Sequence, residues 1–135
     1  MIKQWEERIR IAESQGMGPL VPPTMERWFT APFRSSPPAQ AIARLIADTP
    51  VAGYVGCGQA IMKLGTTARL KEIKLPVLAI TGEADGAAAA TRYIGENVPG
   101  ARFVSIPGAA HIANVEQPEA FNRPLREFLS SLPSA

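Results

Sequence analysis

The order of apolar and polar positions divides the chain into two parts. In the second part, LPVLAITG (75–82) is a short continuous apolar run, and ARFVSI (101–106) is a second predicted strand. Such runs are typical of parallel strands that are buried on both faces. Helical periodicity follows each segment, over residues 87–97 and 117–132. The order strand, helix, strand, helix predicts a βαβ unit of an α/β protein.

The last predicted helix carries an apolar stripe and two prolines. Pro118 suits the first turn, where its missing N–H costs nothing. Pro124 lies inside the helix, where its ring clashes with the preceding turn, so we expect it to kink the helix or split it in two. The stripe consists of Leu125, Phe128, Leu129 and Leu132.

Residues 1 to about 70 predict short helices joined by segments rich in proline and glycine. Gly16 suits the end of the first helix. GMGPLVPP (16–23) is expected to be a loop, and Thr24 is expected to cap the short helix that follows. Ser36 is the expected N-cap of the next helix, because two prolines follow it in the first helical turn.

A further helix is expected from about residue 48 to residue 64, although it contains three glycines. Each glycine costs roughly 1 kcal/mol relative to alanine in a helix interior, so three of them predict close packing against another backbone. Cys57, in the same segment, is the only cysteine of the chain and is expected to be packed in the helical part. A single thiol excludes an internal disulfide and fits a reducing compartment.

The composition excludes several classes of protein. The length of 135 residues fits one domain or part of one, and the net charge of +2 gives no nucleic-acid footprint. No apolar run approaches the ~20 residues of a membrane span, and the N-terminal segment lacks the apolar centre of a signal peptide. We therefore expect a cytoplasmic protein without a nucleic-acid or membrane partner, and without a cofactor or metal. The cationic excess, in residues 1–75, favours an anionic small molecule as ligand.

Two residues with catalytic chemistry follow the two predicted strands. Asp85 comes after the first strand, and His111, the only histidine, comes after the second. Functional loops of such sheets lie at the carboxyl ends of the strands, and neighbouring strands lie only ~4.8 Å apart. A carboxylate that holds the imidazole N–H fixes its tautomer and stabilises the imidazolium that forms on proton uptake. Asp85 alone is also a turn former, and a lone histidine is often a surface residue; their joint placement favours a catalytic pair.

Four segments resemble the C-terminal part of an α/β-hydrolase, in particular the 3-oxoadipate enol-lactonase family. They are ERWFTAPF, GYVGCGQAI, IKLPVLAITGEAD and IPGAAHIANVEQPEAF. The resemblance implies a partial α/β-hydrolase fold, with a helical cap in residues 1–70 and the C-terminal βαβα part of the core in residues 71–135. The early strands of the sheet would be absent. It also implies that Asp85 is the acid and His111 the base of a catalytic triad.

The nucleophile of such a triad is missing from the sequence. It sits in a G-x-S-x-G elbow between a strand and a helix, and no serine of this chain lies in that pattern. Cys57 is a poor substitute, because the positions two before and two after it are Val55 and Gln59, where the elbow needs small residues. The donors of the oxyanion hole would be missing too, and one such donor is worth roughly 10²–10³ in rate. The isolated chain is therefore expected to be inactive.

The resemblance implies the opening of an anionic enol-lactone to a 3-oxo acid once a serine is supplied from elsewhere. Arg27 suits the substrate carboxylate and Trp28 suits the wall of the ring pocket. A surface ion pair for Arg27 and a core position for Trp28 stay open. The alternatives are a catalytically inactive, truncated, self-associating module, or part of a haloperoxidase-like, carbon–carbon-bond or epoxide hydrolase.

The predicted sheet leaves one strand edge without a neighbour. The strand at about residues 75–81 is apolar on both faces, and an exposed apolar edge is a site for pairing with another chain. We therefore predict a partner, either the N-terminal half of the hydrolase on a second chain or another copy of this chain.

Overall fold

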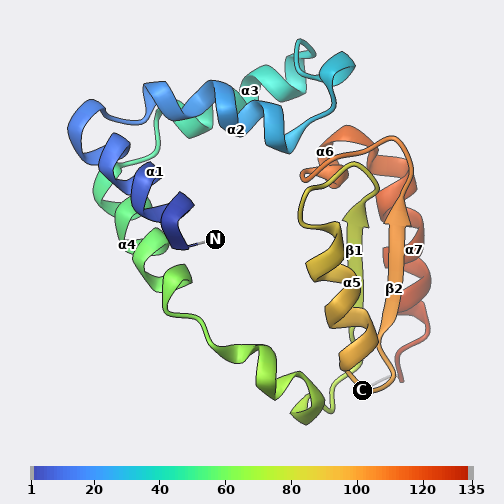
Figure 1. The fold of residues 1–135 in the computed structure, drawn as a ribbon. Coiled ribbons are helices and arrows are strands. Elements are labelled where there is room, and N and C mark those ends of the chain that lie inside the picture. The colour runs from blue at the N-terminus through green and yellow to red at the C-terminus, as the bar shows by residue number, and fades with distance from the viewer. Residues whose placement is uncertain (1, 134–135) are drawn as a thin grey trace. The chain divides into compact units, whose positions relative to one another are not determined.

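The computed structural model describes residues 2–133, which form two compact units (Figure 1). Unit 1 comprises residues 2–26 and 34–65, and unit 2 comprises residues 27–33 and 66–133. Residues 27–33 therefore make their contacts with the second half of the chain, although helices of unit 1 flank them in the sequence.

The regular elements of unit 1 are all helices among its described residues. Its longest helix, α1, packs along α4, and Ile9 and Ala12 of α1 are buried there. The elements of this unit are α1 (Ile2–Gln15), η1 (Gly18–Leu20), α2 (Val21–Trp28, which continues into unit 2), α3 (Pro37–Ala47) and α4 (Val51–Met62). Gly16 ends α1 with a φ of +76°, a left-handed conformation in which a side chain is strained, as predicted for a helix terminus.

The loop predicted for residues 16–23 is wrong for most of its length. Residues 18–20 form η1, and α2 begins at Val21, three residues before Thr24. Thr24 is buried inside the helix and does not cap it. The physical reason is the position of Pro22 and Pro23 in the first turn, where a helix needs no backbone N–H from them.

The predicted cap of α3 is confirmed. The hydroxyl oxygen of Ser36 accepts a hydrogen bond from the backbone N–H of Ala39, over 3.3 Å, and Pro37 and Pro38 fill the first turn. Two independent local signals, the hydroxyl cap and the prolines, therefore agreed on where this helix begins.

The expected packing of α4 holds at one of its three glycines. Gly58 is buried, and a Cβ built on it would lie 3.0 Å from Trp5 and 3.1 Å from Ile9. These contacts are with side chains of α1, whereas a Cβ on Gly53 or Gly56 would meet nothing within 4 Å. Close packing against a backbone was therefore the wrong reason.

Cys57 is exposed, so its predicted packing in the helical part is also wrong. The buried face of α4 passes through the neighbouring Gly58. Because successive residues of a helix are rotated by about 100°, Cys57 points away from that face.

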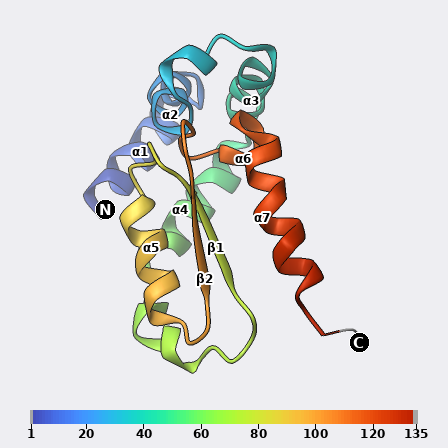
Figure 2. The ribbon, with the colours of Figure 1, turned by 90° about the vertical axis from the view of Figure 1, so that its right-hand side faces the viewer.

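Unit 2 contains the predicted βαβ arrangement, with a parallel two-stranded sheet. Strands β1 (Leu78–Gly82) and β2 (Arg102–Ile106) pair in register, and helix α5 (Ala88–Asn97) connects them. Figure 2 shows α5 on one face of this sheet and α7 (Pro118–Ser130) on the other, so a helix covers each face of the sheet. The remaining elements are η2 (Ala31–Phe33), η3 (Thr66–Glu72) and α6 (Ala113–Glu116).

Helix α7 stays continuous through Pro124. Of the two predicted outcomes, the split does not occur, because a proline removes only one hydrogen bond of the helix and the flanking turns persist, and the kink stays a prediction. The helix begins at Pro118, as predicted. Its apolar side packs against the sheet, where Phe121 and Ile80 contact the buried cluster of Ile106, Ala109 and Ala113.

Strand β1 has one strand neighbour among the described residues, which is β2. Beside it lies an apolar groove of about 340 Å³ between β1 and α7. Its lining consists of Leu78, Ile80, Phe121, Leu125, Phe128 and Leu129, and we call this set the β1/α7 groove. Within residues 2–133, no helix combines the length and the apolar character that crossing a bilayer requires.

Candidate functional site

The loops that follow β1 and β2 are joined at the carboxyl end of the sheet. The N–H of Glu83 donates to the carbonyl of Ile106, and the N–H of Ala84 donates to the carbonyl of Ala109, both over 2.9 Å. Gly82 permits this approach, because a Cβ on it would lie 2.1 Å from the carbonyl oxygen of Ala110. The last residue of β1 therefore fixes the distance between the two loops.

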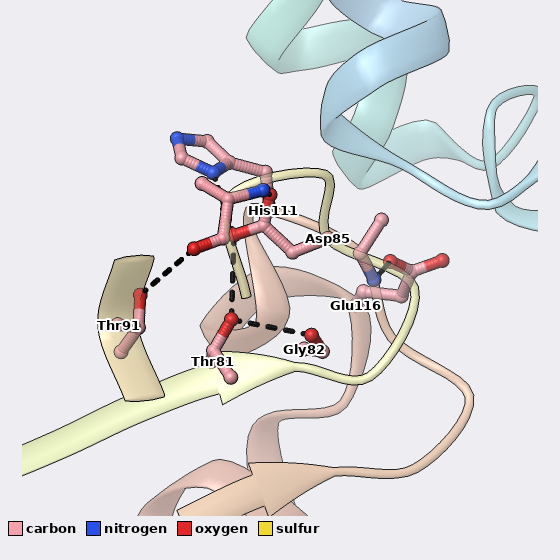
Figure 3. A network of polar contacts seen from close by, with 8 residues as sticks. Thr81, Gly82, Asp85, Thr91, His111 and Glu116 are labelled. Atoms are coloured by element: carbon pink, nitrogen blue, oxygen red, sulfur yellow. Dashed lines mark hydrogen bonds and ion pairs between the residues drawn. The ribbon is translucent and has the colours of Figure 1, made fainter. Parts of the chain in front are cut away.

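The carboxylate of Asp85 is held by the turn that contains it. Its Oδ1 accepts the backbone N–H of Ala87 over 2.8 Å. Its Oδ2 lies 3.4 Å from the hydroxyl of Thr81, which also lies 3.2 Å from the carbonyl of Gly82 (Figure 3). The side chain is only 7% exposed, so these bonds fix one rotamer of a nearly buried acid.

The carboxylate and the imidazole meet across the two loops. Oδ2 of Asp85 lies 3.0 Å from Nδ1 of His111, although the residues are 26 positions apart. The histidine side chain is 41% exposed, and Figure 3 shows its second ring nitrogen directed away from Asp85. When the carboxylate accepts the N–H of Nδ1, Nε2 is left as a base that faces away from the acid.

Trp28 lies beside this pair. Its ring is stacked on that of His111, with 6.1 Å between the centroids and an angle of 25° between the planes. The carbonyl of Trp28 accepts the N–H of Ile112 over 3.1 Å, which ties its backbone to the histidine loop. The structure thus brings Asp85, His111 and Trp28 together. Arg27 is half-buried in the last turn of α2, directly before Trp28.

Glu116 also belongs to this region, although it was not among the residues predicted from the sequence. The residue is 6% exposed, and its carboxylate accepts hydrogen bonds from Ala110 and from Thr30. In the sequence it looks like an acidic residue near the start of the last helix. The one available signal was its apolar neighbourhood, in which an acid needs partners.

Cys57 lies in a setting unlike that of a nucleophile. It lies within α4, the element before α4 in the chain is the helix α3, and both belong to unit 1. A nucleophile elbow requires a strand before the turn and a helix after it. The described part of the chain also contains no group of three or more His, Cys, Asp or Glu side chains that could hold a metal ion.

Comparison with curated proteins finds similarity to enol-lactonases. The chain is 32% identical over 132 residues to 3-oxoadipate enol-lactonase 1 of Acinetobacter baylyi, which covers 95% of this chain and 49% of that protein. A second enol-lactonase of the same organism is 30% identical, with 87% of this chain and 45% of that protein covered. The chain thus spans about half the length of the curated relatives that it matches. No family model matches the sequence.

Solved structures give the same picture. An enol-lactonase from Burkholderia xenovorans LB400 superposes with a TM-score of 0.88 at 32% identity, covering 94% of this chain and 50% of that one. A hydrolase from Pseudomonas aeruginosa PA01 superposes with a TM-score of 0.89 at 30% identity, covering 96% of this chain and 51% of that one. The same arrangement of helices and strands is therefore present in these two solved structures.

Proposed function

We propose that this chain corresponds to the C-terminal portion of an α/β-hydrolase similar to the 3-oxoadipate enol-lactonases, and that Asp85 and His111 are the acid and the base of its hydrolytic triad. The nucleophile would come from polypeptide outside these 135 residues. The observation that carries the proposal is the 3.0 Å contact between Nδ1 of His111 and Oδ2 of Asp85.

The geometry supports a division of labour within this pair. Asp85 is nearly buried, is held by the N–H of Ala87, and has its other oxygen on His111. It therefore fixes the tautomer in which Nδ1 carries the proton, and it stabilises the imidazolium. His111 is partly exposed and directs its second nitrogen away from the acid, as a base that must reach a second reactant.

The proposed reaction is the hydrolysis of an enol-lactone by acyl transfer. Nε2 of His111 removes the proton of a serine hydroxyl while the oxygen attacks the lactone carbonyl. The ring C–O bond breaks, and the proton passes from the imidazolium to the leaving enol oxygen. Water then attacks the acyl-enzyme, with His111 taking its proton and returning it to the serine. The released enol tautomerises to the ketone, so the product is a 3-oxo acid that carries the carboxylate of the substrate and a second carboxylate formed from the lactone carbonyl.

Two side chains of the Trp28 region are proposed to contact the substrate. The stacking of Trp28 on His111 supports a place for its ring next to the reacting carbonyl. Arg27 precedes it and presents a guanidinium, which suits the carboxylate of an anionic lactone through paired hydrogen bonds. Together they would favour anionic lactones over neutral ones.

The partner of this chain is proposed to be the N-terminal half of a hydrolase. Strand β1 has a free edge among the described residues, and the adjoining β1/α7 groove is apolar. An unpaired apolar edge favours association with another strand. A half that supplies the earlier strands would both pair with β1 and bring the serine elbow.

The proposal is tested by reconstitution. The chain is co-expressed with a polypeptide that carries the first strands and a G-x-S-x-G elbow, and the opening of 3-oxoadipate enol-lactone is followed. Activity is expected from the pair and from neither chain alone, and His111→Ala is expected to abolish it. An assembled pair without activity, or with activity that survives His111→Ala, would contradict the proposal.

The second candidate is a self-associating module without catalysis. The open edge of β1 and the β1/α7 groove favour it, because two copies could cover these surfaces mutually. Sedimentation of the chain alone distinguishes the two. A stable dimer that excludes the N-terminal half would favour the module, whereas displacement of the second copy by that half would favour the enzyme.

A further inference from the structure

Glu116 is a buried acid that takes no part in the proposed reaction. It ends the four-residue helix α6, and its side chain is almost completely removed from solvent. Burying a charged carboxylate is costly unless hydrogen bonds compensate for it. The hydrogen bonds of Glu116 therefore indicate its structural role.

The two oxygens of this carboxylate bind two different segments of the chain. Oε2 accepts the backbone N–H of Ala110 over 2.7 Å. Oε1 accepts both the backbone N–H of Thr30, over 3.0 Å, and the hydroxyl of the same residue. Thr30 lies 86 positions away in the sequence, so one side chain joins the end of the Trp28 segment to the loop of His111.

His111 is consequently bracketed by ties to a single segment. The residue before it, Ala110, reaches Thr30 through Glu116. The residue after it, Ile112, donates directly to the carbonyl of Trp28 over 3.1 Å. These hydrogen bonds hold the backbone on both sides of His111. The imidazole between them stacks on the ring of Trp28.

We infer that Glu116 is a positioning residue that holds His111 against Trp28 by joining Ala110 to Thr30. Asp85 fixes the imidazole from one side through Nδ1, and Glu116 fixes the backbone that carries it. The value of this bridge for catalysis rests on the proposed function, but the bridge itself can be tested without activity.

The decisive variant is Glu116→Gln in the full chain. A glutamine has the same shape but only one acceptor oxygen, and the other oxygen becomes an NH₂ donor. Because Thr30 offers two donors, the remaining oxygen is expected to stay on Thr30, which leaves the NH₂ facing the N–H of Ala110. The hydrogen bond of Ala110 is then lost while that of Thr30 persists.

Amide hydrogen exchange measures this difference directly. The Ala110 amide is expected to exchange roughly 10- to 100-fold faster in Glu116→Gln, the loss typical of a hydrogen bond to a charged group. The reference is the amide of Val98, a buried residue whose N–H donates to Ile94 within unit 2. Its exchange should accelerate less than that of Ala110, because local opening of the His111 loop leaves the Val98 hydrogen bond in place and only a loss of global stability would affect it.

The single imidazole gives a second readout. The Hε1 resonance of His111 senses the ring of Trp28, so Glu116→Gln is expected to move it toward its position in Trp28→Ala. Glu119→Gln, which removes an exposed acid from the first turn of α7, is the matched control and should leave both signals in place.

The outcomes separate a positioning role from a merely structural one. Equal acceleration at Ala110 and Val98, or no change at Ala110, would overturn the inference. If Glu116→Gln does not fold, Thr30→Val removes only the hydroxyl donor and Thr30→Ser keeps it. The bridge is supported if the His111 resonance shifts in Thr30→Val and keeps its parent position in Thr30→Ser. A His111 resonance that does not shift in Thr30→Val would overturn the inference. Inactive reconstituted enzyme with these signals intact would instead count against the proposed reaction.

Discussion

Gly82 lies directly beneath Ala110, with no space between them for a side chain. A Cβ on Gly82 would lie 2.1 Å from the carbonyl oxygen of Ala110 and 2.4 Å from that of Ala109. Both contacts are with backbone atoms, which cannot rotate away as a side chain can. The approach of the Asp85 loop to the His111 loop therefore depends on the absence of a single methyl group.

Gly82→Ala is expected to destabilise the fold by about 3 kcal/mol, because the added methyl must separate two hydrogen-bonded loops. Chemical denaturation followed by circular dichroism measures the change. The matched control is Gly86→Ala, where a Cβ would meet nothing within 4 Å. A Gly82→Ala protein as stable as the Gly86→Ala protein would show that the loops can separate at little cost.

Asp85→Asn is expected to lower kcat of the reconstituted enzyme by roughly 10⁴-fold. The amide oxygen would keep the bond from Ala87, so that the NH₂ faces Nδ1 of His111 and selects the tautomer protonated at Nε2. Nitrogen NMR of the only histidine reports this tautomer directly, even in the chain alone. Glu83→Gln, an exposed neighbour, should change neither the spectrum nor the rate.

Gly56→Ala and Gly58→Ala are expected to differ in sign. Both positions are in α4, where alanine is preferred over glycine by roughly 1 kcal/mol. At Gly56 the methyl meets open space, so the thermal midpoint should rise. At Gly58 it would lie 3.0 Å from Trp5 and 3.1 Å from Ile9, so the midpoint should fall. An equal rise in the thermal midpoint for both variants would show that the side chains of α1 can move aside at little cost.

Leu129→Lys is expected to weaken association with a partner, whether the N-terminal half or a second copy. Leu129 is 56% exposed and lines the β1/α7 groove, and a charge there would have to be desolvated on binding. Sedimentation or co-purification measures the bound fraction. Ser130→Lys introduces the same charge one residue further along α7, outside the groove lining, and should bind as the parent chain does. Equal weakening by both variants would exclude the groove as the interface.

Much of unit 2 could be predicted, because its signals are local. The continuous apolar run LPVLAITG located β1 and the segment ARFVSI located β2, and Asp85 and His111 lie in the loops that follow these strands. Parallel pairing then required that both residues lie at one edge of the sheet. In unit 1, Ser36 marked the start of α3 for the same reason, since a cap is defined by its immediate neighbours.

Unit 1 was predicted less well, because proline and glycine occur both in loops and within helices. Pro22 and Pro23 suggested a loop but lie in the first turn of α2. Of the three glycines in α4, only Gly58 faces α1, and the exposure of Cys57 follows from the same rotation of the helix. Which face of a helix is buried depends on the neighbouring helix. The residues of the segment itself do not identify that neighbour.

The sequence by itself determined which residues end the strands, and therefore that a carboxylate and an imidazole meet at the tip of the sheet. Only the tertiary structure decided what surrounds them: the absence of space above Gly82, the stacking of Trp28 on His111, and the bridge of Glu116 to Thr30. The reason is distance along the chain. Strand ends are fixed by neighbouring residues, whereas the bridge joins residues 86 positions apart, and no local pattern announces a contact that exists only after the chain has folded.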